Sequence, residues 1–173
     1  MPRLVSRAAR ALLACAALCL ACTAGAGEIK PWKGAAPTLE LPDLDGHAHA
    51  LAEYKGRVVV VNFWATWCEP CRAEMPSMQK MADKYGADKL VVLGVNYQEG
   101  APRIRRFLEA NPVHFTVLMD RDGAVTKKWT SRIFPTSVIL GPDGRARQIV
   151  TGETDWNAPA MDALIAKLLP KQK

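Results

Sequence analysis

The sequence is poor in the residues that bind metals or cross-link small folds, and after residue 26 it has no long apolar run. Of its 5 cysteines, Cys15, Cys19 and Cys22 lie within the first 26 residues, and the chain has only 3 histidines. The remainder therefore lacks the cysteines for a disulfide framework or for a zinc site of four thiolates. No later segment approaches the roughly 18 apolar residues that predict a transmembrane helix. The chain also shows no internal repeat and no low-complexity tract.

The first 26 residues have the pattern of a targeting segment. Three arginines make a basic start, an apolar stretch follows over Ala11–Ala21, and Ala24-Gly25-Ala26 places small residues before a cleavage point. This order predicts a secretory signal peptide over residues 1–26. We therefore expect an exported protein of the periplasm, a compartment in which disulfides form and exchange.

The three cysteines of this leader allow one alternative, a lipoprotein anchored at Cys22. Such sites usually have Leu three residues before the lipidated cysteine, and this chain has Cys19 there. A small, weakly polar residue is acceptable in an apolar targeting stretch, which favours cleavage over lipidation. After cleavage only Cys68 and Cys71 remain.

The part after the leader is long enough for one domain with its own core. A short linker with glycine and proline is expected over residues 27–36, and a single domain over residues 37–170. The formal charge is +6, but the leader holds three arginines and no acid, so the mature chain is near +3. Because this excess is modest and the chain is exported, we expect no nucleic-acid partner.

Strand and helix patterns alternate along this domain. Val58–Phe63 is a continuous apolar run, typical of a strand covered on both faces. Asp45-Gly46 favours a hairpin between strands over 39–41 and 47–51. The other expected strands cover 90–95, 113–119, 136–140 and 146–151, and the expected helices cover 71–85, 101–110, the residues around 125–129, and 161–168. The pattern predicts an α/β fold, with a mixed sheet, helices on both faces and an N-terminal β-hairpin.

Two cysteines lie at the junction between the predicted buried strand and the helix that follows it. Cys68 and Cys71 are three residues apart on the first helical turn, which places their Cα atoms about 5 to 6 Å apart, within reach of a disulfide. The ring that they close is small, so the bond adds little stability and is free for chemistry. The helix N-terminus favours a thiolate at the first sulfur. We therefore expect Cys68 to be the nucleophile and Cys71 the resolving thiol.

The sequence around these thiols resembles the thioredoxin superfamily, and within it the exported TlpA/ResA-like branch. The resemblance rests on the run Val61–Cys71, on Pro76, on Phe134-Pro135-Thr136 and on the hairpin after it, and it extends from about Pro37 to the closing helix. It implies a thioredoxin-like fold and thiol–disulfide exchange.

The resemblance also implies a substrate-binding surface beside the disulfide. It predicts a cis bond before Pro135, which exposes the backbone of Phe134 so that a substrate chain can add to it as a strand. Trp67 is expected at the rim of this surface.

Between the cysteines, the Glu69 carboxylate raises the pKa of Cys68 and Pro70 removes an amide donor, and this combination favours a reductant.

Glu74 is the predicted proton carrier. It lies three residues after Cys71, at the border of the apolar helix face, where partial burial is expected to raise its pKa. The resolving thiol must lose and regain a proton, which Glu74 can supply. Thioredoxins have a buried Asp where this chain has Asn62, and the ResA-like branch combines that Asn with an acid at the Glu74 position. The alternative is a surface glutamate paired with a lysine or arginine.

Two other uses of the cysteines are disfavoured. A zinc site needs about four ligands, and only His47 and His49, which share one face of a strand, stand ready to join the two thiols. A peroxidatic cysteine of the peroxiredoxin type needs a Thr and a Pro where this chain has Ala65 and Val61. We therefore expect no metal site and no cofactor.

These observations predict a periplasmic thiol–disulfide oxidoreductase that reduces protein disulfides. By resemblance, its substrates include the haem-attachment cysteines of apocytochrome c, or cysteines of copper-site proteins, and a membrane thiol carrier reduces it again. We expect a monomer. The alternative of another class is a copper chaperone that binds Cu(I) through Cys68 and Cys71, because soft thiolates suit that ion.

Overall fold

The computed structural model describes residues 27–170 of the chain. The predicted signal peptide and its three cysteines lie outside the described residues. Within the described part, no helix has both the length and the apolar character needed to cross a membrane.

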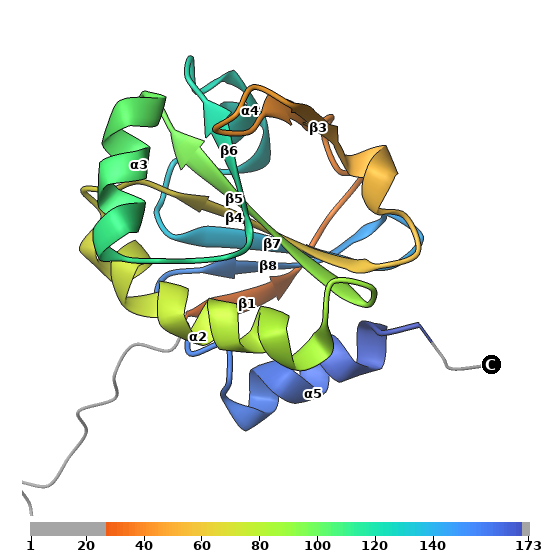
Figure 1. The fold of residues 1–173 in the computed structure, drawn as a ribbon. Coiled ribbons are helices and arrows are strands. Elements are labelled where there is room, and N and C mark those ends of the chain that lie inside the picture. The colour runs from red at the N-terminus through yellow and green to blue at the C-terminus, as the bar shows by residue number, and fades with distance from the viewer. Residues whose placement is uncertain (1–26, 171–173) are drawn as a thin grey trace, which may run out of the picture.

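A six-stranded mixed sheet forms the centre of the molecule (Figure 1), in the order β1-β8-β7-β4-β5-β6. The strands β4, β5 and β6 are parallel to one another, whereas β7, β8 and β1 continue the sheet from β4 in antiparallel pairs. Their bounds are β1 Glu28–Pro31, β4 Val58–Trp64, β5 Leu90–Tyr97, β6 Thr116–Asp120, β7 Thr136–Leu140 and β8 Ala146–Thr151. The carboxyl ends of β4, β5 and β6 therefore meet at one edge of the sheet.

The central strand β4 is buried along its whole length because it has a layer on each face. Its alternate side chains enter different clusters, as the period of two in a strand requires. Val59, Val61 and Phe63 face the cluster that contains Trp129. Val58 and Val60 face the cluster that contains Met78, Met81, Trp156 and Ile165. The continuous apolar run in the sequence is thus explained by a strand with two covered faces.

Helices pack on both faces of the sheet, as predicted (Figure 1). On one face lie α2 (Glu69–Tyr85), α3 (Ala101–Ala110) and α5 (Pro159–Leu168), which contribute Met78, Ile104 and Ile165 to the core. On the other face lies α4 (Ala124–Trp129), with the small hairpin beside it.

The predicted N-terminal hairpin is present as a separate two-stranded sheet. Its strands are β2 (Glu40–Pro42) and β3 (Ala48–Ala50). The second strand is shorter than predicted, because Leu51 begins the 3-10 helix η1 (Leu51–Tyr54). The carboxylate of Glu53 accepts the N–H of Ala50 at 3.1 Å, which stabilises this change of direction.

Two further boundaries differ from the predictions. Residues 28–31, which fall within the predicted linker, form the edge strand β1 against β8, with Ile29 opposite Val150. All four side chains of β1 are exposed, so the strand is held by backbone pairing and has no apolar pattern to reveal it. Strand β6 begins at Thr116 and not at residue 113, because the N–H of His114 is bonded to the Gln79 side chain at 2.6 Å.

Candidate active site

The two cysteines lie at the carboxyl end of β4, where α2 begins. They form a disulfide with an S–S distance of 2.04 Å and a Cα–Cα distance of 5.3 Å. Cys68 is the N-cap of α2, and its sulfur accepts the N–H of Cys71 at 3.3 Å. This contact and the helix N-terminus both stabilise negative charge on the Cys68 sulfur once the disulfide is reduced. Cys71 is the more buried of the pair, at 1% exposure against 5% for Cys68.

An apolar surface adjoins the disulfide. Trp67 is 59% exposed, and its ring meets the ring of Phe134 edge-on at 5.9 Å. The centroid of the Phe134 ring also lies 5.2 Å from the centroid of the Tyr97 ring. The bond between Phe134 and Pro135 is cis, as the resemblance implied. Phe134 also packs against the cluster that contains Cys68 and Cys71, so the predicted substrate-binding residues are brought together here.

Glu69 and Pro70, between the two cysteines, occupy the first two positions of α2. Glu69 is exposed and Pro70 is half-buried. At the start of a helix Pro removes an N–H that has no partner within the helix, so it is compatible with the fold there. Glu69 thus directly follows, in an exposed position, the cysteine that is expected to attack.

Glu74 is buried behind the disulfide, at only 3% exposure. Its Oε1 accepts a hydrogen bond from Asn62 Nδ2 at 2.7 Å. Its Oε2 accepts from the N–H of Thr154 at 3.2 Å and from Trp156 Nε1 at 3.4 Å. The alternative of a surface glutamate in an ion pair is therefore wrong, because all three donors are neutral and the side chain is inside the protein.

Burial changes the proton affinity of this carboxyl. Removal from water raises the pKa of Glu74 to about 8, although the hydrogen bonds from Asn62, Trp156 and Thr154 act in the opposite direction. The direction agrees with the prediction from the sequence. A carboxyl with this pKa gives up or takes a proton close to neutral pH. Asn62 also donates to Ser137 Oγ at 2.9 Å, which fixes its amide against β7 and aims it at Glu74.

A second buried glutamate near the site was missed by the sequence reasoning. Glu99 follows β5 and is 8% exposed. It accepts hydrogen bonds from the N–H of Thr66 at 2.7 Å, from Thr66 Oγ1 at 2.6 Å and from Asn96 Nδ2 at 2.8 Å. Arg103 forms an ion pair with it at 2.7 Å. The signal that could have found it is positional, since Glu99 follows a strand that neighbours β4 in parallel and so ends at the same edge.

The buried Trp64 beside the cysteines needs a glycine on the neighbouring strand. A Cβ on Gly94 of β5 would lie 2.9 Å from the Phe115 ring and 3.2 Å from Trp64 Nε1. Only glycine leaves room for both rings at this position. Trp64 in turn packs on Phe107 of α3 at 5.4 Å, which joins α3 to the cysteine loop.

His47 and His49, the histidines considered as zinc ligands, form no shared metal-binding group with the two cysteines among the described residues. Among residues 27–170, the group of acidic, histidine and cysteine side chains close enough to share a metal ion consists of Asp43, Asp45 and His47. It lies on the hairpin turn and includes neither Cys68 nor Cys71.

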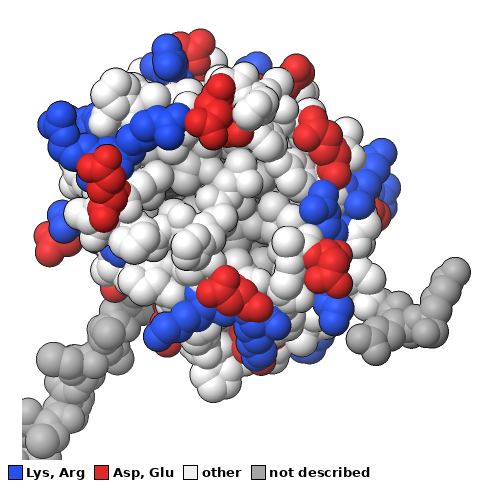
Figure 2. Space-filling model, viewed as in Figure 1, with Lys and Arg blue, Asp and Glu red and all other residues white. Residues whose placement is uncertain are grey.

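The charged side chains on the face shown in Figure 2 lie mainly around its rim. Basic and acidic side chains alternate around its rim and leave an uncharged centre. Such a mixed pattern differs from the basic stripe of a nucleic-acid-binding surface.

Comparisons with known proteins agree with this geometry. Residues 33–149 match the model of the AhpC/TSA family. The chain is similar to the thiol-disulfide oxidoreductase ResA of Geobacillus kaustophilus, with 36% identity over 117 residues that cover 68% of this chain and 67% of the relative. It is also similar to the thioredoxin-like protein YneN of Bacillus subtilis, with 38% identity over 120 residues that cover 68% and 69%.

A solved structure supports the predicted thioredoxin-like fold. This is a Chlorobium tepidum protein described as a candidate thiol:disulfide interchange protein DsbE, with a TM-score of 0.71 and 30% identity over 78% of this chain and 94% of that one. Together with the CxxC disulfide at the start of α2, these matches show that the chain belongs to the AhpC/TSA family, as a thioredoxin-like thiol–disulfide oxidoreductase.

Proposed function

We propose that this protein is a periplasmic reductant of protein disulfides. The observation that carries the proposal is the pairing of an N-terminal helix cysteine, Cys68, with a buried acid, Glu74, one helical turn beyond the second cysteine. This arrangement provides an attacking thiolate and a proton carrier on the same helix.

The exchange proceeds in two steps that together move two electrons to the substrate. The Cys68 thiolate attacks one sulfur of a substrate disulfide, forms a mixed disulfide and releases the other substrate sulfur as a thiolate. Cys71 then loses its proton and attacks the Cys68 sulfur, which releases the second substrate thiolate. The protein is left with the Cys68–Cys71 disulfide that the structure contains.

Glu74 acts in the second step of this proposal. In its ionised form it takes the proton of Cys71, and in the reverse reaction it returns it. Its pKa of about 8 suits this exchange at neutral pH, because both forms are present there. Asn62, Thr154 and Trp156 hold the carboxyl in place without adding charge.

The apolar surface formed by Trp67, Phe134 and Pro135 receives the substrate chain beside Cys68, with Glu69 and Pro70 at its edge. An extended peptide binds to the backbone of Phe134 as an added strand, while Trp67 packs on its side chains. We propose cysteines of apocytochrome c, or those of copper-site proteins, as the substrates. The similarity to proteins named thiol-disulfide oxidoreductase ResA and thiol:disulfide interchange protein DsbE supports protein disulfides as the wider substrate class.

Export and re-reduction complete the proposal. The predicted signal peptide directs the protein to the periplasm, where a membrane thiol carrier reduces the disulfide again, and the protein acts as a monomer. The negative charge of Glu69, the residue after Cys68, opposes formation of the Cys68 thiolate and favours the reducing direction.

A trapping experiment tests this function. In the Cys71→Ser variant, expressed in the native host, the second step is blocked, so substrates remain bound to Cys68 and can be identified by mass spectrometry. We expect periplasmic cysteine proteins, cytochrome precursors among them, and none in the matched Cys68→Ser control. If the trap stays empty while the purified wild-type protein retains copper and loses its free thiols, the copper chaperone replaces the reductase.

A further inference from the structure

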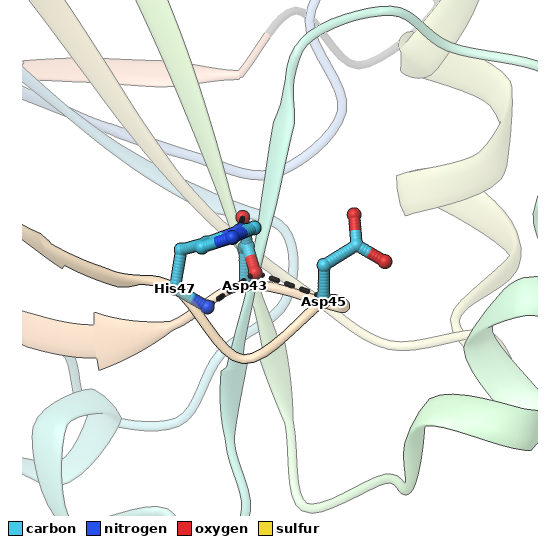
Figure 3. A group of neighbouring side chains, drawn as sticks. All are labelled: Asp43, Asp45 and His47. Carbon is cyan, nitrogen blue, oxygen red and sulfur yellow. Dashed lines mark hydrogen bonds and ion pairs between the residues drawn. The ribbon is translucent and has the colours of Figure 1, made fainter.

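The turn between β2 and β3 gathers three side chains that can share a metal ion, with a fourth, His49, beside them. Figure 3 shows Asp43, Asp45 and His47 around this turn, with the His47 ring folded back over the Asp43 carboxylate and Asp45 beside it. The potential ligand atoms of these three residues lie within 4.8 Å of one another. His49, two residues after His47, lies outside this group but contacts the same Asp43 carboxylate. The cluster is separate from the cysteine site and has no part in the proposed exchange.

One oxygen of Asp43 lies between two imidazoles. Its Oδ2 is 3.3 Å from His47 Nδ1 and 3.1 Å from His49 Nε2. Residues two apart along a strand share a face, so both rings reach the same carboxylate. In the absence of a metal, a proton on each ring occupies the place between the nitrogen and the oxygen. A divalent cation that binds Asp43 Oδ2 can take the place of these protons and draw both rings toward itself.

The other ring nitrogen of His49, Nδ1, already has a hydrogen-bond partner. Its Nδ1 is 2.6 Å from the hydroxyl of Tyr54, a residue only 8% exposed, and the two rings are stacked at 6.3 Å. Histidines that bind metals usually have such a partner on the other ring nitrogen, which sets the tautomer and the ring orientation. Once an ion replaces the proton on Nε2, Nδ1–H can donate to the Tyr54 oxygen, and the Nε2 lone pair then faces the ion.

The turn itself is held rigid by bonds that do not use the proposed ligand atoms. Asp43 Oδ1 accepts the N–H groups of Asp45 at 2.8 Å and of His47 at 2.9 Å, which leaves Oδ2 to the histidines. Arg105 of α3 donates to the carbonyl of Leu44 at 2.6 Å and to Asp45 Oδ1 at 2.7 Å. Because the turn is already rigid, it loses little conformational entropy when an ion binds.

We propose that Asp43, His47 and His49 form a binding site for a divalent transition-metal ion of the zinc type. Two imidazoles and a carboxylate are the ligands that Zn²⁺ accepts in three-residue sites, where water fills the fourth position. The His47 side chain is 77% exposed, whereas His49 and Asp43 are 21% and 19% exposed, so the ion reaches the site from solvent on the His47 side. This proposal revises the expectation of a chain without metal ligands.

Calorimetric titration with Zn²⁺ tests the site on the full chain, with the disulfide oxidised and all remaining thiols alkylated. We expect a single Zn²⁺ per chain, a loss of affinity of tenfold or more in His47→Ala, and a similar loss in His49→Ala. The matched control is His114→Ala, which removes the third histidine of the chain and should change the affinity less than twofold. Mg²⁺, which prefers oxygen ligands, should not compete.

Two further variants refine the test. Asp43→Asn keeps an oxygen for the N–H groups of the turn but removes the anionic ligand, and should weaken Zn²⁺ binding to a similar extent. Arg105→Ala removes the hydrogen bonds that hold Leu44 and Asp45 in the turn, and should weaken Zn²⁺ binding to a smaller extent. Because His47 is mostly exposed, thermal unfolding of His47→Ala should match the wild type. Absence of Zn²⁺ binding in the wild type, or equal weakening in His114→Ala, would overturn the proposal.

Discussion

Two buried glutamates lie near the same cysteine loop and differ in one respect, their charged partners. Glu74 receives its hydrogen bonds from neutral groups of Asn62, Thr154 and Trp156. Glu99 receives hydrogen bonds from Thr66 and Asn96 and has the cation of Arg103 beside it. A buried carboxylate without a counter-charge is costly to ionise, whereas one with a cation and several donors serves as a fixed anchor.

This difference assigns the two carboxyls to different tasks. The pKa of Glu74 is raised to about 8, and in the proposed mechanism its position one turn after Cys71 lets it exchange a proton with that thiol. Glu99 holds the backbone of Thr66, two residues before Cys68, and so fixes where the loop lies. A carboxyl that exchanges protons and a carboxyl that positions a loop can therefore be distinguished by their partners, even when both are buried.

The largest expected effect concerns the pH dependence of stability at Glu74. Its pKa is raised to about 8 in the folded protein, so between the unfolded value and pH 8 the folded state binds more protons. Stability should therefore fall as pH rises from about 5 to 9 and level off above the folded pKa. Since one unit of pKa difference corresponds to about 1.4 kcal/mol, the fall should reach a few kcal/mol.

Glu74→Gln should remove this contribution. Urea unfolding of both proteins at several pH values gives the difference in free energy of unfolding, and this difference should shrink or reverse toward alkaline pH. Glu99→Gln is the matched control, in which the slope with pH should equal that of the wild type. Parallel slopes for wild type and Glu74→Gln would show that Glu74 does not titrate in this range.

Removal of the anchoring carboxylate should destabilise the protein at every pH. Glu99→Ala leaves the N–H of Thr66, its hydroxyl and the Asn96 amide without their acceptor, and each unsatisfied buried group costs about 1 to 3 kcal/mol. We expect a loss of about 3 kcal/mol in urea unfolding, with a smaller loss in Glu99→Gln, which keeps one acceptor oxygen. A loss under about 0.5 kcal/mol, as for an ordinary surface substitution, would contradict the anchoring role.

The kinetics of thiol–disulfide exchange should distinguish Glu74 from Glu99 more clearly than unfolding measurements do. Glu74→Gln should slow the release of substrate from the mixed disulfide at least tenfold at pH 7, since general acid–base catalysis contributes about a hundredfold or more. Stopped-flow measurements with a model disulfide should show the mixed disulfide accumulating, with little change in the first attack by Cys68. If Glu99→Gln causes the same accumulation, proton transfer does not explain the effect.

The smallest expected effect is at Thr66. Thr66→Val removes the hydroxyl that donates to Glu99 Oε1 but keeps the backbone N–H that donates to Oε2. The hydroxyl also accepts a hydrogen bond from Arg103 Nε at 2.9 Å, but the exposed Arg103 keeps its ion pair with Glu99, so the expected loss is about 1 kcal/mol. Urea unfolding should show this loss, while the attack rate of Cys68 should stay within about twofold of the wild type. A larger kinetic effect would place the hydroxyl closer to the chemistry than the anchoring role requires.

The sequence predicted those parts of the site whose signal is local. Cys68, Cys71 and Glu74 follow one another on a single helix, so their spacing alone indicates that they share a face. The buried strand β4 was evident from its composition, and the cis bond at Pro135 followed from the resemblance.

Contacts between distant residues could not be predicted in the same way. Glu99 reaches Thr66 from 33 residues away, and no spacing rule links the two. Strand β1 has only exposed side chains, so it depends on backbone pairing with β8, more than 100 residues later in the chain. His47 and His49 were recognised as sharing a face, but their meeting point at Asp43 depends on the fold of the turn.

The pairing of β1 with β8 has a consequence for the residue just before it. A Cβ on Gly27 would lie 2.2 Å from Thr154 Oγ1, and Thr154 is the residue whose N–H donates to Glu74. The first residue after the predicted cleavage point therefore contacts the segment that supports the proton-carrying acid. Residue 27 thus packs against the segment that holds Glu74, and a bulkier side chain there would disturb the hydrogen bond from Thr154 to this acid.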